Sequence, residues 1–233
     1  MGAPLPFDPA LPFALLWDRR LGAARLFTAP IEVAGGVDAE EVLRRVADWT
    51  AAGDWAVGAL SYEAGAALDP AVRQLSRGAG WARFGRYATP RLLDRAALAE
   101  LLADLRETGR GPADVGPLQP QVEAGAWQAA VERVRAYIAS GDIYQANLTF
   151  PVAVPVCGHP LGLFARLFSP DAAPHGGVVH WGGGCWWLCL SPELFFTLEE
   201  GRLTARPMKG TAVRAAGTAE DAAAALALAG DPK

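Results

Sequence analysis

Cysteine is scarce in this sequence. The chain of 233 residues has three, Cys157, Cys185 and Cys189, an odd number that cannot pair completely into disulfides. A chain of this length can build a core without covalent staples, so the cysteines fit a reducing compartment, and we expect the cytoplasm. Cys185 and Cys189 lie four positions apart in an apolar run, which favours core thiols on one face of a strand over a metal-binding pair.

Long runs of one chemical character are also missing. No apolar stretch is long enough to cross a bilayer, and residues 1–12 have no basic segment of the kind that begins a secretory signal. The net charge is −4 and the sequence pI is about 5.4, and the basic residues form no run. We therefore expect neither a membrane nor a nucleic acid as a partner.

Metal-ligand patterns are absent as well. The three histidines, His159, His175 and His180, are not spaced as metal ligands, and the sequence contains neither HExxH nor CxxC. From these patterns we predict no metal site within this chain.

The sequence does contain enough apolar residues for a large core. Hydrophobic residues make up 52% and charged residues 20% of the chain, which is typical of one large domain or two small ones. Residues 107–125 are rich in glycine and proline, which predicts an irregular connector. We divide the chain into an N-terminal α/β segment over residues 1–110, a linker over 111–124 and a second segment over 125–233.

The N-terminal segment shows signals for helices and strands. Asp38 with Glu41 three residues later matches a capping box, and apolar residues then recur at helical spacing up to Gly53. Residues 55–62 are predicted to form a mostly buried strand, and residues 92–105 an amphipathic helix.

The second segment has a similar mixture. Apolar residues at helical spacing over 127–138 predict a helix that ends at Gly141 in the left-handed conformation. Further predicted elements are a helix over 161–168, strands over 178–181 and 185–190, a hairpin of strands 194–198 and 203–206 turning at 200–201, and a helix over 218–229.

One predicted strand, over residues 143–150, alternates in polarity. Gln145, Asn147 and Thr149 would share one face, and apolar side chains would occupy the other. This polar row predicts either a solvated sheet face or the lining of a pocket.

Three positions could converge on one chemical site. Lys209 lies between Pro207 and the pair Gly210–Thr211, a setting that could hold a carboxylate beside an amine, although many turn lysines are simply solvated. Glu193 follows an apolar strand beside a proline and precedes Lys209 by 16 residues, a separation that a hairpin can close. It is either a solvated turn residue or a carboxyl with a raised pKa that acts as a general acid.

These residues resemble the chorismate-utilising enzymes. The resemblance rests on residues 140–148 (SGDIYQANL), 191–193 (SPE) and 206–211 (RPMKGT), with residues 55–65 similar to the N-terminal part of the family. Order and spacing agree over nearly the whole chain. The fold implied by the resemblance is α+β, a sandwich of two antiparallel sheets flanked by helices, incomplete here at its C-terminus.

Two positions separate branches of this family. Isochorismate and salicylate synthases have a water-activating lysine where this chain has Gln145, and anthranilate synthases usually have alanine where it has Lys209. The combination resembles the aminodeoxychorismate synthase component I branch, which serves para-aminobenzoate and folate synthesis. Anthranilate synthase component I and a non-catalytic remnant of the family remain alternatives.

The resemblance also implies roles. Lys209 would be the nucleophile and Glu193 the general acid, while Gln145, Gly210 and Thr211 would contact chorismate. Ammonia would come from a glutamine amidotransferase subunit, and Mg²⁺ would be held by residues that this chain does not contain. Because relatives run on for roughly another two hundred residues, we expect this chain to be truncated and inactive alone.

Overall fold

The computed structural model describes residues 5–69, 71, 80–108, 114–207 and 210–231. The chain divides into two compact units, Met1–Pro6 with Ala99–Leu167, and Phe7–Leu98 with Phe168–Lys233. Each unit is described by itself. The predicted boundaries of the linker at residues 111 and 124 stay predictions.

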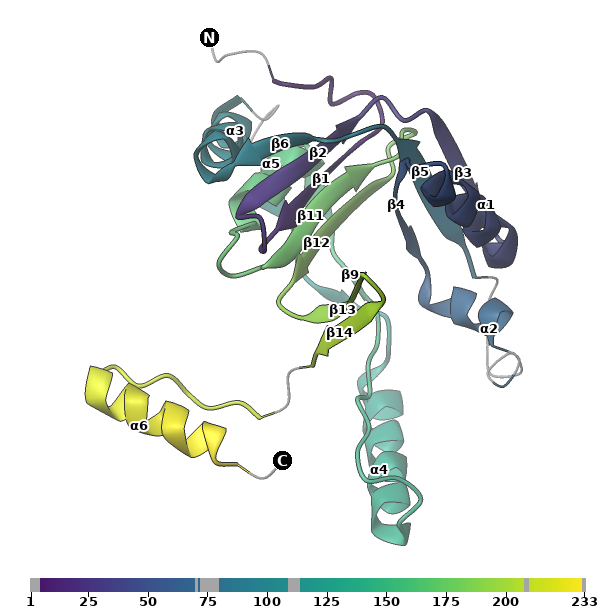
Figure 1. Ribbon diagram of the computed structural model, residues 1–233. Coiled ribbons are helices and arrows are strands. Elements are labelled where there is room, and N and C mark those ends of the chain that lie inside the picture. Colours follow the sequence, from purple (N-terminus) through teal and green to yellow (C-terminus); the bar gives the residue numbers. More distant parts are fainter. Residues whose placement is uncertain (1–4, 70, 72–79, 109–113, 208–209, 232–233) are drawn as a thin grey trace. The chain divides into compact units, whose positions relative to one another are not determined.

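The larger unit contains a five-stranded antiparallel sheet in the order β12-β11-β1-β2-β6 (Figure 1). Its strands are β1 (Phe13–Asp18), β2 (Ala23–Thr28), β6 (Arg91–Asp94), β11 (His175–His180) and β12 (Trp186–Ser191). The central strands β1 and β11 are the most buried, and they join parts of the sequence about 160 residues apart, with Phe13 opposite His180.

A second antiparallel sheet in the same unit has the order β3-β5-β4. Its strands are β3 (Glu32–Gly36), β4 (Trp55–Leu60) and β5 (Ala82–Tyr87). Helix α1 (Ala39–Ala51) begins at Asp38, whose side chain accepts a hydrogen bond from the Glu41 N–H. This confirms the Asp38 half of the predicted capping box, and the Glu41 carboxylate pairs with Arg44.

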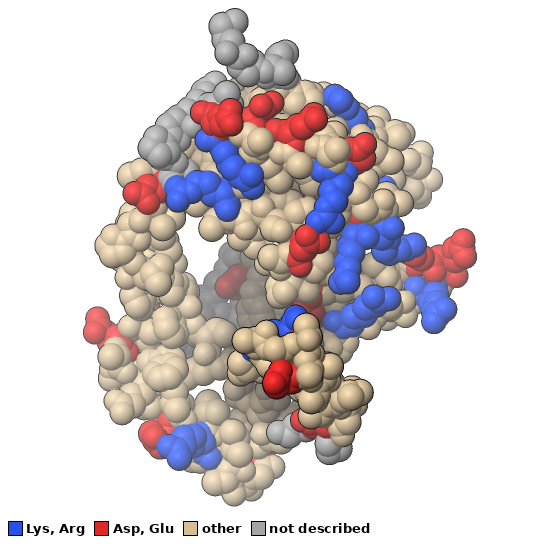
Figure 2. Space-filling model, turned by 90° about the vertical axis from the view of Figure 1, so that its left-hand side faces the viewer, with Lys and Arg blue, Asp and Glu red and all other residues tan. Residues whose placement is uncertain are grey.

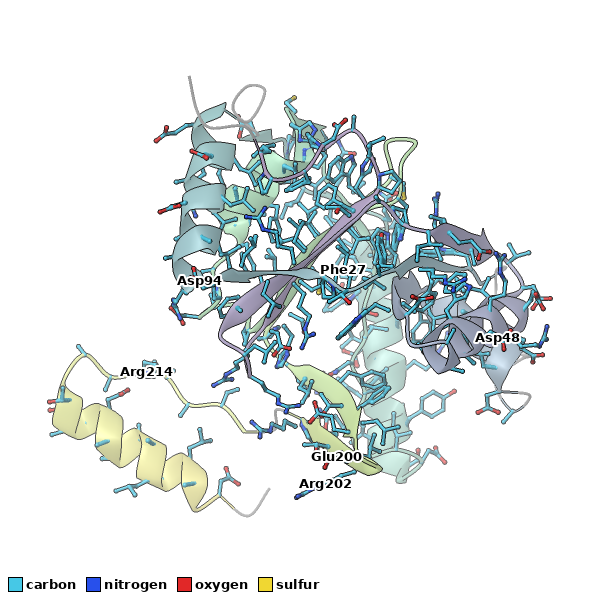
Figure 3. The ribbon with its side chains drawn as sticks, turned by 45° about the horizontal axis from the view of Figure 1, so that its top comes forward. Phe27, Asp48, Asp94, Glu200, Arg202 and Arg214 are labelled. Atoms are coloured by element: carbon cyan, nitrogen blue, oxygen red, sulfur yellow. The ribbon has the colours of Figure 1, made fainter. Side chains whose placement is uncertain are left out.

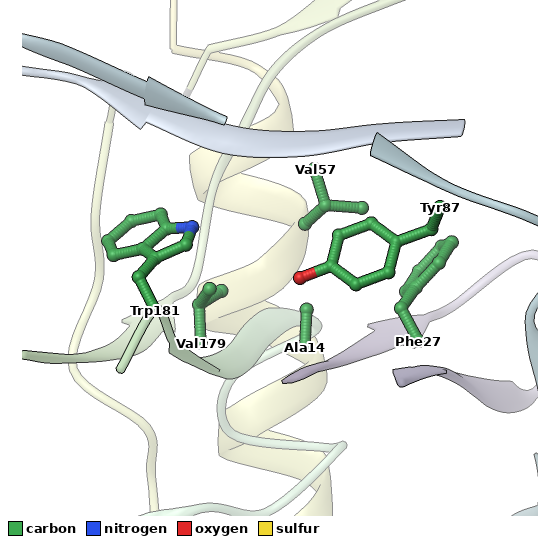
Figure 4. Packing of buried hydrophobic residues seen from close by; sticks show 6 residues of the cluster. All are labelled: Ala14, Phe27, Val57, Tyr87, Val179 and Trp181. Atoms are coloured by element: carbon green, nitrogen blue, oxygen red, sulfur yellow. The ribbon is translucent and has the colours of Figure 1, made fainter. Parts of the chain in front are cut away.

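Two apolar clusters hold these layers together. One joins both sheets through Ala14, Phe27, Val57, Tyr87, Val179 and Trp181 (Figure 4). The other packs α1 on the three-stranded sheet through Ala34, Ala39, Val42, Trp49, Ala64 and Ala82. The predicted α+β arrangement of two antiparallel sheets with flanking helices is confirmed.

Two short helical turns, a hairpin and a helix complete the described part of the larger unit. Short helical turns η1 (Tyr62–Ala64) and α2 (Gly65–Leu68) follow β4. The predicted hairpin is confirmed as β13 (Leu194–Glu199) and β14 (Arg202–Arg206), which turn through Glu200 and Gly201, both with positive φ. Helix α6 (Thr218–Ala229) has the bounds that the sequence predicts.

The smaller unit is built from helices and short strand pairs. It contains most of α3 (Arg95–Thr108), with α4 (Ala124–Ser140) and α5 (Pro160–Leu167). The Arg106 side chain donates to the Ala165 carbonyl at 2.7 Å and ties α3 to α5. Gly141 ends α4 at φ 82°, as predicted.

The connector is less irregular than its composition predicts. Strand β7 (Asp114–Val115) pairs with β10 (Val156–Cys157), and β8 (Gln119–Pro120) pairs with β9 (Val152–Ala153). These are two-residue ladders with partners more than thirty residues away in sequence, so no local sequence pattern predicts them.

Two element predictions are wrong. Residues 143–150 form no regular secondary structure; no described strand pairs with them, and Phe150 instead makes an edge-to-face contact with Trp127 of α4 at 6.4 Å. The helix predicted over 92–105 begins only at Arg95, because the preceding residues pair with β2 as strand β6.

Two burial predictions are also wrong. Strand β4 ends at Leu60, and Val57 is its one fully buried residue; Trp55 and Leu60 at its two ends are exposed, and the other three residues are partly buried. The predicted pair of core thiols is wrong, because Cys185 is only partly buried and Cys189 is exposed. Cys157, which was not part of that prediction, is also exposed.

Candidate functional site

Glu193 occupies the turn between β12 and the β13–β14 hairpin. The Ser191 hydroxyl donates to the Glu193 carbonyl at 3.0 Å and accepts from the Glu193 N–H at 3.4 Å, which closes the turn around Pro192. Glu193 is exposed. In the described part of this chain Glu193 is therefore a turn residue open to solvent, and its role as a general acid stays a prediction.

The hairpin explains how distant positions of the motif approach one another. Leu194, next to Glu193, lies opposite Arg206 in the strand register. Glu193, just before the first strand of the hairpin, and the segment just after its second strand therefore lie at the same end of the hairpin. Lys209 itself lies outside the described residues, so its predicted role stays a prediction.

Gly210 and Thr211 follow directly and are exposed. A side chain at residue 210 would begin 3.0 Å from Leu228 Cδ1 of α6, so glycine lets the backbone pass close to that helix. The described structure does not test their predicted contacts with a substrate.

Gln145 lies in the irregular segment after α4 and is exposed. The polar row that was expected to display it on a strand does not form. Gln145 belongs to the smaller unit and Glu193 to the larger one, so the structure does not test whether they share a site.

A feature that the sequence does not reveal lies at the other end of the hairpin. Arg20, in the turn between β1 and β2, forms an ion pair with Glu199 at the end of β13. An open hollow beside this pair is lined by Arg20, Glu199, Glu200, Arg202 and Thr204, and Figure 3 shows Glu200 and Arg202 at the hairpin turn. Because 179 positions separate Arg20 from Glu199, no local signal could have predicted this contact.

The turn that carries Arg20 is organised by Asp18. One carboxylate oxygen accepts from the Arg20 and Leu21 N–H groups, and the other accepts from the Arg25 guanidinium at 2.8 Å. Burial alone would raise the pKa of Asp18, but these hydrogen bonds outweigh it and hold the pKa below its ordinary value of 3.8.

This pKa predicts a pH dependence of stability. A carboxyl whose pKa is lower in the folded state stabilises the fold above its unfolded-state pKa and loses that contribution as pH falls through the folded value. Between pH 5 and pH 2, the unfolding free energy should therefore fall more steeply for the wild type than for Asp18→Asn in urea titrations. Asp48→Asn, an exposed change on α1, is the matched control, and equal slopes for wild type and Asp18→Asn would contradict the assignment.

The described residues show no cluster of possible metal ligands. They contain no group of three or more His, Cys, Asp or Glu residues that could hold a metal ion. The Mg²⁺ expectation therefore has no ligand set among them, and no step below is routed through the ion. On the face seen in Figure 2, acidic and basic side chains are interspersed. Among the described helices, none is both long and apolar enough to cross a membrane.

Comparison with known proteins identifies the relationship. The family model described as chorismate binding enzyme matches residues 28–233. An anthranilate synthase from Azospirillum brasilense is 30% identical over 209 residues, which is 80% of this chain and 29% of that protein. No solved structure gives a significant match.

Relatives named for a different activity have similar identity to this chain. Aminodeoxychorismate synthase component 1 from Klebsiella aerogenes is 34% identical over 46% of this chain and 26% of that protein. A 2-amino-4-deoxychorismate synthase from Streptomyces globisporus is 33% identical over 57% of this chain and 27% of that protein. The chain thus spans less than a third of the length of these relatives, and identity alone does not choose among their activities.

Proposed function

This chain belongs to the chorismate binding enzyme family, and on that premise we propose that it forms part of an aminodeoxychorismate synthase. The reaction would convert chorismate and ammonia to 4-amino-4-deoxychorismate. The observation that carries the proposal is the pairing of Gln145 with Lys209, the combination that sets this branch apart from water-adding and anthranilate-forming relatives. The β13–β14 register supports it, because Glu193 and the segment leading to Lys209 meet at the same end of the hairpin.

Two displacements would accomplish the amination. The amine of Lys209 attacks C2 of the chorismate ring while the double bond shifts and the C4 hydroxyl leaves, protonated by Glu193. Ammonia then adds at C4, the double bond shifts back, and the lysine amine is expelled. An ordinary lysine is almost wholly protonated at neutral pH, so attack requires surroundings that lower the pKa of Lys209.

Other residues and partners have supporting parts in this proposal. Gln145, Gly210 and Thr211 hold the substrate, and Gln145 leaves the site without a base for water. A glutamine amidotransferase subunit delivers ammonia, and Mg²⁺ binding would need ligands other than the described residues. We place the reaction in the cytoplasm, where thiols such as the exposed Cys157 and Cys189 stay reduced.

The alternative activity, anthranilate formation, is favoured by one observation: the Azospirillum brasilense relative aligns with 80% of this chain. The two reactions differ in whether they release pyruvate. 4-Amino-4-deoxychorismate keeps the enolpyruvyl group, whereas anthranilate formation releases it as pyruvate. The protein encoded by the native gene, incubated with chorismate, ammonium and Mg²⁺, should consume chorismate without releasing pyruvate. Pyruvate in proportion to the chorismate consumed would support the alternative instead.

The role of Glu193 can be tested by substitution. Glu193→Gln keeps the size of the side chain but removes the acid, so kcat should fall by about 10²–10⁴-fold with KM little changed. Glu200→Gln, at the far end of the same hairpin, is the matched control and should keep wild-type kcat. Equal activity of Glu193→Gln and wild type would remove Glu193 from the mechanism.

A further inference from the structure

Two polar atoms lie inside the core between the sheets of the larger unit. The Tyr87 hydroxyl and the Trp181 indole nitrogen are both buried, and neither has a hydrogen-bond partner among the described residues. Tyr87 is 1% exposed and Trp181 is 3% exposed. Buried polar groups in native proteins are almost always paired with protein or with ordered water, because desolvation without a replacement bond is costly.

The two atoms come from different sheets and face the same space. Tyr87 ends β5 of the three-stranded sheet, and Trp181 directly follows β11 of the five-stranded sheet. In Figure 4 the tyrosine hydroxyl and the indole nitrogen point toward one another across their shared cluster, with Val57, Val179 and Ala14 around the space. These three neighbours have apolar side chains, so they offer the two polar atoms no partner.

The backbone is shaped to place the tyrosine hydroxyl there. Gly85, two residues before Tyr87 on β5, would carry a Cβ only 2.8 Å from the Tyr87 hydroxyl oxygen and 2.6 Å from its ring. The ring thus lies across its own strand in space that only glycine leaves open. Glycine at position 85 therefore allows the Tyr87 ring and hydroxyl to lie against the strand.

We propose that one water molecule binds between Tyr87 Oη and Trp181 Nε1 and links the two sheets. An indole N–H can only donate, so the bridging group must accept from it, and a phenol can either donate or accept. Water satisfies both conditions, whereas a cation would be repelled by the indole donor. The proposal is independent of the chorismate reaction.

The protonation state of the tyrosine supports this arrangement. Burial raises the pKa of Tyr87 to about 12. The hydroxyl therefore keeps its proton throughout the neutral range and can donate to a water.

Removing the Tyr87 hydroxyl tests the proposed water bridge, because the two alternatives predict opposite changes in stability. If a water is bound, Tyr87→Phe removes its hydrogen bond to the hydroxyl and leaves the indole N–H as its only named partner. The equilibrium constant for unfolding should then rise about tenfold. If the hydroxyl has no partner, its removal relieves a penalty, and the constant should stay the same or fall, which would overturn the proposal. Tyr62→Phe, where the side chain is 96% exposed, is the matched control and should change nothing.

A direct observation separates water from a bond between the two side chains. In ¹H–¹⁵N spectra of the wild-type protein, the Trp181 indole proton, assigned with Trp181→Phe, should show a magnetisation-transfer peak to a long-lived water. That peak should disappear in Tyr87→Phe. A destabilised Tyr87→Phe variant without any water peak in the wild type would indicate a direct hydrogen bond and overturn the proposal. Should the variant fail to fold, the wild-type water peak alone decides.

Discussion

Replacing Lys209 by alanine is expected to reduce kcat for chorismate amination by about 10³-fold or more. In the proposed mechanism its amine forms the covalent bond at C2 that makes C4 open to ammonia, and alanine offers no nucleophile for this step. The measurement is the rate of chorismate consumption by the native gene product under saturating ammonium. Because the lysine acts in the chemical step, kcat should fall far more than KM rises.

The chain supplies its own control for this experiment. This sequence has two lysines, Lys209 and Lys233, so Lys233→Ala removes a lysine outside the motif and should leave kcat unchanged. Digestion and mass spectrometry after incubation with chorismate should find any adduct on the peptide that contains Lys209. Full activity in Lys209→Ala would contradict the covalent route and favour the alanine-containing, anthranilate-forming branch.

Truncating Phe27 to alanine should lower the free energy of unfolding by about 3–5 kcal/mol. Phe27 is 2% exposed on β2, and its ring centroid lies 5.4 Å from that of Tyr87 and 5.7 Å from that of Trp55 on the opposing sheet. It therefore joins the two sheets, and its removal leaves a cavity between them. Urea unfolding followed by tryptophan fluorescence measures the loss.

Phe195→Ala is the matched control for this prediction. Phe195 is 85% exposed on β13, so the same truncation there should change the unfolding free energy by about 0.5 kcal/mol or less. A comparable loss at both positions would mean that the packing between the sheets does not carry the stability assigned to it. Because domains are stable by only about 5–15 kcal/mol, the Phe27 variant should unfold at a markedly lower urea concentration.

Elements with local signals could be predicted from the sequence. Asp38 marks the start of α1 because its side chain accepts the Glu41 N–H, and Gly141 marks the end of α4 because it takes a positive φ. The β13–β14 turn follows from Gly201, whose φ is 76°. In each case the residues that decide the structure are neighbours in the sequence.

Elements decided by distant partners could not be predicted. The residues just before Arg95 form β6 because β2 pairs with them. Their short apolar pattern is compatible with either a strand or a helix, so the sequence alone could not decide between the two. The alternation over 143–150 needs a partner strand to become a ladder, and none is described. The alternation of polar and apolar residues therefore predicted a strand that does not form, because no described strand pairs with these residues.

The candidate site divides in the same way. Glu193, Lys209, Gly210 and Thr211 could be proposed from the sequence because their motifs are short and contiguous, and their roles stay predictions. The hairpin register adds that Leu194, next to Glu193, lies opposite Arg206. The Arg20–Glu199 ion pair and the facing polar atoms of Tyr87 and Trp181 depend on strand neighbours far apart in the sequence. Nothing in the local sequence distinguishes these residues from ordinary surface or core positions.

The identity of the reaction product tests the central claim most directly. The native gene product would be incubated with chorismate, Mg²⁺ and ¹⁵N-labelled ammonium, and the product identified by mass spectrometry. The account predicts 4-amino-4-deoxychorismate with one ¹⁵N atom and an intact enolpyruvyl group. Labelled anthranilate, or a product with a new hydroxyl in place of nitrogen, would contradict it.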